Sequence, residues 1–114
     1  MACFFFPPQE QHFTDHPVYE GVQVARLVGR DAGMPVGVLL LKLEPGVEIP
    51  VHTHEDNLDS IYVAAGRAAL FTDGAWQEAG PGTCLLAPAG EEHGVRNAGR
   101  EPLLLLVHHS PALM

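Results

Sequence analysis

Glycine and proline are scattered along the whole chain and divide it into short segments, which constrains the fold more than any other feature. The 114 residues include 12 glycines and 10 prolines. No long window places apolar residues at the i, i+3, i+4 and i+7 positions of an amphipathic helix. The segments themselves are rich in β-branched and apolar residues, which favours strands. The sequence predicts an all-β chain with strands at residues 21–27, 36–43, 50–54, 60–65, 68–71, 76–79, 83–87, 93–97 and 103–109.

The length and the number of short strands together predict one closed or double-sheet β domain. Folded domains most often contain about 100–150 residues, so the chain has no room for a second core. We expect residues 21–114 to form this domain and residues 1–20 to form an N-terminal arm. The arm contains three adjacent phenylalanines, Phe4 to Phe6, which we expect to pack on the domain or on a second subunit. The apolar arm and the edge strands of a small β structure predict a homodimer.

The charge and the composition exclude several classes of partner. The net charge is −8, the wrong sign for nucleic acid or anionic lipid. The apolar runs are far shorter than the roughly 20 residues of a membrane helix, and the N-terminus has no pattern of a secretory signal. Cys3 and Cys84 form no disulfide framework. We expect a cytoplasmic protein with reduced cysteines, whose partner is a small molecule rather than nucleic acid or a membrane.

The stretch "PVHTHEDNLD" at residues 50–59 holds the first candidate site. Side chains alternate faces along a strand, so His52 and His54 would lie on one face and could bind one ion. Taken alone the pair is weak, because a chain with seven histidines produces such a pair readily by chance. A surface or core pair stays open at this point.

More residues stand at fixed distances from this pair. From Gly46 to Gly66 the sequence reads G-x5-H-x-H-x4-D-x6-G, and from Gly82 to Asn97 it reads G-x5-P-x-G-x2-H-x3-N. These patterns, at residues 46–66 and 82–97, resemble the two motifs of the cupin superfamily, with aspartate in the first motif where glutamate is usual. The resemblance covers residues 36–110 and implies a double-stranded β-helix, the cupin jelly-roll barrel.

The resemblance also implies that His52, His54, Asp59 and His93 are the metal ligands and the candidate catalytic residues. Three imidazoles and one carboxylate suit a single divalent transition metal, namely iron, manganese, nickel, copper or zinc. Aspartate is one methylene shorter than glutamate, so Asp59 either coordinates the ion directly or acts through a ligand or a water.

For several other residues a structural role is the stronger interpretation. His108 and His109 are adjacent, so only one can face inward, and a terminal structural role is favoured over contact with a metal or a substrate. Cys84 is expected to be a small buried hydrophobe, and Arg96 to point away from His93. Asn97 is expected to cap a turn. Strand parity predicts a mainly apolar pocket with walls formed by Ile61, Val63, Cys84, Leu86 and Val95.

These features favour a metal-dependent enzyme that acts on a small, mostly apolar substrate, with a dioxygenase of quercetinase-like type as the first choice and Asp59 or Glu48 as the residue that handles a proton. A metal-dependent isomerase, lyase or decarboxylase is an alternative that uses the same ligands. A non-catalytic protein that binds or senses a metal or a small ligand is a further alternative. Metal-free epimerase chemistry is weakened by the complete set of three histidines.

Overall fold

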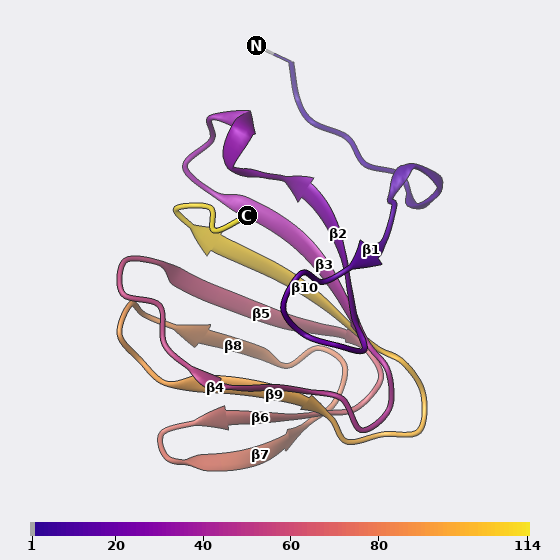
Figure 1. Ribbon diagram of the computed structural model, residues 1–114, viewed down its shortest axis with the longest axis vertical. Coiled ribbons are helices and arrows are strands. Elements are labelled where there is room, and N and C mark those ends of the chain that lie inside the picture. Colours follow the sequence, from indigo (N-terminus) through magenta and orange to yellow (C-terminus); the bar gives the residue numbers. More distant parts are fainter. Residues whose placement is uncertain (1) are drawn as a thin grey trace.

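The computed structural model describes residues 2–114 and shows two antiparallel sheets that face each other (Figure 1). The larger sheet has six strands in the order β1-β2-β3-β10-β5-β8, and the smaller has four in the order β4-β9-β6-β7. Two single-turn 3-10 helices, η1 (Pro8–Glu10) and η2 (Arg30–Ala32), are the helical elements of these residues. The strands are β1 (Thr14–Asp15), β2 (Val22–Val28), β3 (Gly37–Leu43), β4 (Glu48–His52), β5 (Leu58–Ala65), β6 (Ala68–Thr72), β7 (Ala75–Ala79), β8 (Cys84–Ala87), β9 (His93–Asn97) and β10 (Leu103–Ser110). This arrangement is the predicted jelly roll.

The core lies between the inner faces of the two sheets. Strands β3 and β10 lie side by side in the larger sheet, and along both of them buried and half-buried residues alternate, as expected for strands with one face on a core. Leu43, Val63, Leu103 and Leu105 are completely buried. Burying such a side chain contributes about 1.5–3 kcal/mol. The paired strands therefore hold their inward side chains on a rigid frame.

Each of the nine predicted strands is present, with ends that differ by at most two residues. One difference affects the site: β4 ends at His52, so His54 lies in the loop that follows, not in the strand predicted at residues 50–54. Strand β1, which pairs with β2, was not predicted because its two residues are too short a pattern to detect. The tight turn at Asp73-Gly74 is confirmed, since both residues have positive φ, 50° and 84°, and join β6 to β7.

The outer face of the larger sheet is largely apolar. The strand register places Leu40, Leu106, Tyr62 and Cys84 opposite one another in a row across β3, β10, β5 and β8. Asp59, which points inward, is the single acidic residue of β2, β3, β5, β8 and β10, although the chain contains 14 acids. The outer face of these five strands therefore carries no negative charge.

The N-terminal arm leaves apolar rings in contact with solvent. Phe5 is 84% exposed and Phe4 is 50% exposed, whereas Phe13 lies beneath the Lys42 ammonium group, 4.2 Å from it. Packing of the arm on a second subunit stays a prediction. None of the helices in residues 2–114 has the length and apolar character needed to cross a membrane.

Candidate metal centre

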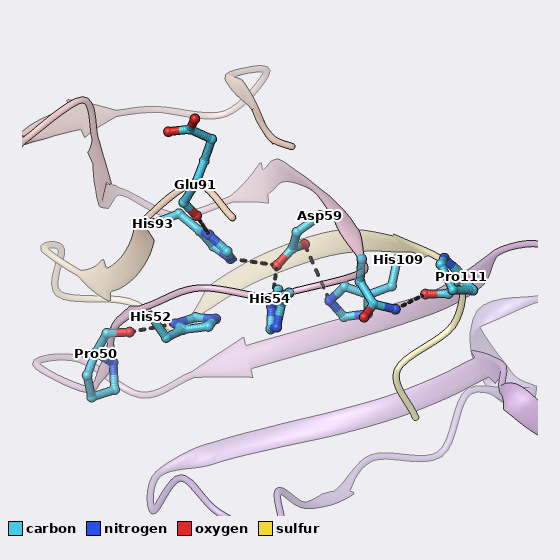
Figure 2. Close-up of polar contacts among 9 residues, drawn as sticks. Pro50, His52, His54, Asp59, Glu91, His93, His109 and Pro111 are labelled. Atoms are coloured by element: carbon cyan, nitrogen blue, oxygen red, sulfur yellow. Dashed lines mark hydrogen bonds and ion pairs between the residues drawn. The ribbon is translucent and has the colours of Figure 1, made fainter. Parts of the chain in front are cut away.

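The four side chains singled out by the sequence converge at one end of the space between the sheets (Figure 2). His52 ends β4, His54 follows in the loop, Asp59 lies on β5 and His93 begins β9. His52 and His93 are direct partners across β4 and β9, and their ring centroids lie 4.4 Å apart. One ligand atom from each of the four residues lies within 4.8 Å of the others.

Backbone carbonyls fix the tautomers of two of the histidines. His52 Nδ1 lies 2.7 Å from the Pro50 carbonyl oxygen, and His93 Nδ1 lies 3.0 Å from that of Glu91. A carbonyl only accepts, so each Nδ1 carries the proton and donates it. Each neutral ring therefore has its lone pair on Nε2, the arrangement that metal-bound histidines use.

Burial also keeps two of the rings neutral. Burial lowers the pKa of His52, although the bond to the Pro50 carbonyl opposes it. Burial likewise lowers the pKa of His54, opposed by the charge of Asp59. Neutral imidazole is the form that binds a metal ion.

Asp59 is 4% exposed and supplies the carboxylate. Its Oδ2 lies 2.9 Å from His93 Nε2 and 3.4 Å from His54 Nε2. Burial alone would raise the pKa of Asp59, but the nearby imidazoles of His109 and His93 outweigh it and hold this pKa far below its usual range. Burial would lower the pKa of His93, but the bond to Asp59 outweighs it and raises this pKa. A carboxylate oxygen and an imidazole lone pair approach this closely only with a proton or a metal ion between them.

The spacing of the four residues fits one transition-metal ion. With bonds of 2.0–2.2 Å, ligand atoms around a zinc ion lie roughly 3–4 Å from one another. The observed upper limit of 4.8 Å requires only a small contraction. Nitrogen and oxygen ligands of this kind do not distinguish among iron, manganese, nickel, copper and zinc.

A fifth side chain, that of His109, joins the cluster from β10. His109 is 7% exposed, and its Nε2 lies 3.4 Å from Asp59 Oδ1. Its predicted structural role, favoured over contact with a metal or a substrate, stays a prediction, but His109 is the one of the adjacent pair that faces inward. It faces inward because it continues the alternation of Leu103, Leu105 and Val107, which are all buried. That alternation was the sequence signal that could have identified it.

A cavity of about 280 Å³ extends from the cluster, and its walls are mostly apolar. Residues 16–19 and the two C-terminal residues also line it. No lysine or arginine among residues 2–114 contributes to the walls. Its apolar residues include Leu39, Leu41, Ile49, Ile61, Val95, Leu105, Val107, Leu113 and Met114.

The predicted pocket walls are only partly correct. Ile61 and Val95 line the cavity, and Val63 is in the core. Cys84 is exposed and Leu86 is 59% exposed, so their assignment to the pocket, and the expectation that Cys84 is buried, are wrong. The register pairs Cys84 with Tyr62, which faces outward, so β8 directs Leu85 and Ala87 inward instead.

Two other expectations concern β9 and its neighbour β4. Arg96 does point away from the cluster, because its guanidinium lies 4.5 Å from the centroid of Trp76 and 4.0 Å from the Glu48 carboxylate. Glu48 is therefore on the outer surface, and its suggested role in proton transfer is wrong. Asn97 is structural as expected, since its side-chain amide donates to the carbonyls of Leu43 and Glu101.

Comparison with known proteins agrees with this geometry. The family described as "Cupin domain" matches residues 39–109. An oxalate-binding protein of Thermotoga maritima is 26% identical over 87 residues, which cover 75% of this chain and 72% of that protein.

Solved structures share the fold. KdgF from Halomonas sp. aligns with a TM-score of 0.86 at 23% identity, over 98% of this chain and 96% of the other. A predicted oxalate decarboxylase from Thermotoga maritima aligns with a TM-score of 0.84 at 22% identity, over 96% and 99% of the two chains. The jelly roll, the clustered histidines and the family match lead to one conclusion: the chain belongs to the cupin family.

Proposed function

We propose that this protein binds one divalent transition metal through His52, His54 and His93, with Asp59 as the fourth group, and acts on a small, mostly apolar substrate. The observation that carries the proposal is the position of the ligand cluster at one end of an apolar cavity. A substrate in this cavity would have its polar end at the cluster and its apolar part against the walls. Each of the four residues has a chemical reason to be there, because it offers a lone pair to one shared point.

The charge of the cluster and the apolar cavity walls favour a neutral or singly charged substrate. A divalent ion and one carboxylate leave a net charge of +1 at the cluster, which suits a neutral or singly charged chelating group. A second carboxylate on the substrate would meet apolar walls without a lysine or arginine to compensate it, and burying an unpaired charge is costly. A lipophilic chelator such as an enolised 1,3-diketone or a catechol therefore fits better than a small dicarboxylate.

Dioxygen-dependent oxidation of such a substrate is our first choice of reaction. A bound redox-active ion would supply the electron transfer to dioxygen, and a zinc or nickel ion would supply Lewis acidity. The protein's own groups would position the chelating end of the substrate. Asp59 is buried, but its pKa is held far below its usual range, which makes it a weak acceptor for the proton of a substrate hydroxyl. Isomerase, lyase or decarboxylase chemistry would use the same arrangement.

Binding without turnover is a second candidate. It is favoured by the relative described as an oxalate-binding protein, at 26% identity. In this case the metal-binding end of the cavity would only recognise the small molecule, and the protein would act as a carrier or a sensor.

The test begins with metal analysis of the protein purified under anaerobic conditions. The protein is then reconstituted separately with each of the five metals, and 1,3-diketones and catechols are offered while dioxygen uptake and ligand binding are measured. Uptake that requires iron, manganese or copper and is lost in His93→Ala supports the oxygenase. Binding without turnover under every metal supports the second candidate. His108→Ala is the matched control for His93→Ala and should keep the metal and the uptake. A wild-type protein that binds no stoichiometric metal would overturn the metal-based proposal itself.

A further inference from the structure

We propose that His109 is a positioning residue that holds the Asp59 carboxylate by its Oδ1 atom, so that Oδ2 alone is presented to the metal. The inference rests on the metal binding of the proposed function but on none of its chemistry. It assigns a role to a residue outside the cupin motifs, and it explains how an aspartate can serve where glutamate is usual.

The position of His109 relative to Asp59 is fixed by the sheet. The two residues are direct partners across β10 and β5, and β10 lies between β3 and β5 in the larger sheet. Side chains opposite each other in an antiparallel pair have Cβ atoms about 4.5–5.5 Å apart. The contact therefore depends on strand register and not on a loop, and it forms whenever the sheet forms.

The two oxygens of the carboxylate face different partners (Figure 2). Oδ2 lies 2.9 Å from His93 Nε2 and 3.4 Å from His54 Nε2, whereas Oδ1 lies 3.4 Å from His109 Nε2. Asp59 Oδ1 is buried and has no hydrogen bond of good geometry, and His109 Nδ1 is also buried without a partner. Buried polar atoms are rarely left unsatisfied, so a small rotation of the carboxylate toward His109 is the natural way to satisfy Oδ1.

His109 also compensates for the short side chain of Asp59. A glutamate would carry its carboxylate about 1.5 Å further from the strand, one carbon–carbon bond. Asp59 lacks this reach, and a carboxylate with one oxygen free could rotate away from the ion. A donor on the opposite strand removes that freedom, which is the usual way that hydrogen-bonded partners orient metal ligands.

His109 could in principle be a fifth ligand instead, and the geometry argues against it. The rings of His52, His54 and His93 have centroids 4.4–5.1 Å apart. The His109 ring lies 5.7 Å from the nearest of them, that of His54, and the Asp59 carboxylate stands between His109 and His93.

The test measures cobalt binding, because Co(II) is a visible-spectrum probe of its own ligand set. The Co(II) dissociation constant is determined against a competing chelator, and the d–d absorption spectrum is recorded for the wild type, His109→Ala, His109→Gln and His108→Ala. His108 is next in sequence but faces outward, so it is the matched control. We expect His109→Ala to weaken Co(II) binding about 10–100-fold and to shift the d–d bands. His109→Gln, whose amide can donate to Oδ1, should restore most of the affinity, and His108→Ala should match the wild type.

A double-mutant cycle with Asp59→Ala completes the test. A residue that acts through Asp59 cannot change the Co(II) affinity once the Asp59 carboxylate is removed. His109→Ala should then leave Co(II) affinity unchanged in the Asp59→Ala background. Unchanged affinity and spectrum in His109→Ala alone would overturn the inference. A loss as large as that in His93→Ala, persisting without Asp59, would also overturn it, because His109 would then be a ligand. If the wild type itself fails to bind Co(II), Zn(II) or Ni(II), the proposed function fails, which is a different result from a null effect of His109.

Discussion

Metal binding should raise the thermal stability of this protein by an amount that can be worked out in advance. The ion would join Asp59 on the larger sheet to His52 and His93 on the smaller. It cannot bind the unfolded chain in the same way, because these residues then have no fixed positions. A ligand at 100 times its dissociation constant stabilises the folded state by about 2.7 kcal/mol.

The expected shift in melting temperature follows from the chain length. An unfolding entropy of about 2.1 cal/mol/K per residue gives about 0.24 kcal/mol/K for 114 residues, so 2.7 kcal/mol corresponds to about 11 °C. Some binding of metal to histidines of the unfolded chain would reduce this value. The shift should still be several degrees.

The measurement is differential scanning calorimetry of protein stripped with a chelator, then titrated with Zn(II), Ni(II), Co(II), Mn(II) or anaerobic Fe(II). His93→Ala should lose most of the shift, whereas His12→Ala, which removes an exposed histidine of the arm, should keep it. An equal shift in His93→Ala and the wild type would refute the reasoning, because stabilisation would then come from a site elsewhere. The absence of any shift with all five metals would refute it as well.

Three further predictions concern single substitutions. Asp59→Asn keeps the shape of the side chain but removes its charge, so metal affinity should fall at least about tenfold, as measured by isothermal titration calorimetry; unchanged affinity would show that the carboxylate is not needed. Leu105→Ala shortens a completely buried side chain that also lines the cavity, and it should cost about 2–5 kcal/mol in urea unfolding. Leu104→Ala on the outer face of the same strand should cost clearly less, and equal losses would contradict the assignment of the two faces. We also propose that the protein is a homodimer in which two copies pack through the outer face of β2, β3, β10, β5 and β8. This face carries no acidic side chain, so the repulsion between two chains of net charge −8 is smallest there. Leu86→Lys should then give a monomer in sedimentation velocity while Ala98→Lys, on an exposed loop, does not; a monomeric wild type would count against the dimer.

The jelly roll and the four clustered side chains could be predicted because the sequence resembles the two cupin motifs, whose residues stand at fixed spacings. Turn residues separate the strands, and the distances from Gly46 to Gly66 and from Gly82 to Asn97 are fixed along the chain. Strand ends were less certain, since a pattern of alternating residues does not show where hydrogen bonding stops. For this reason His54 was expected in a strand and is found in a loop.

Features that depend on how distant strands pair could not be predicted. The face of Cys84 is set by its pairing with Tyr62, and a shift of one residue in β8 reverses every side chain of that strand. His109 enters the site because β10 pairs with β5 so that it stands opposite Asp59. Fifty residues separate these two in the sequence, and no local pattern contains their register.

The division of the cluster between the two sheets has a mechanical consequence. An ion held by His52 and His93 from one sheet and by Asp59 from the other would act as a cross-link at this end of the barrel. Separation of the sheets would then require the metal bonds to break, so local opening and ion release become one event. Any condition that slows hydrogen exchange at β4 and β9 should therefore slow metal exchange as well. The ion would then contribute to the lifetime of the folded protein as well as to its chemistry.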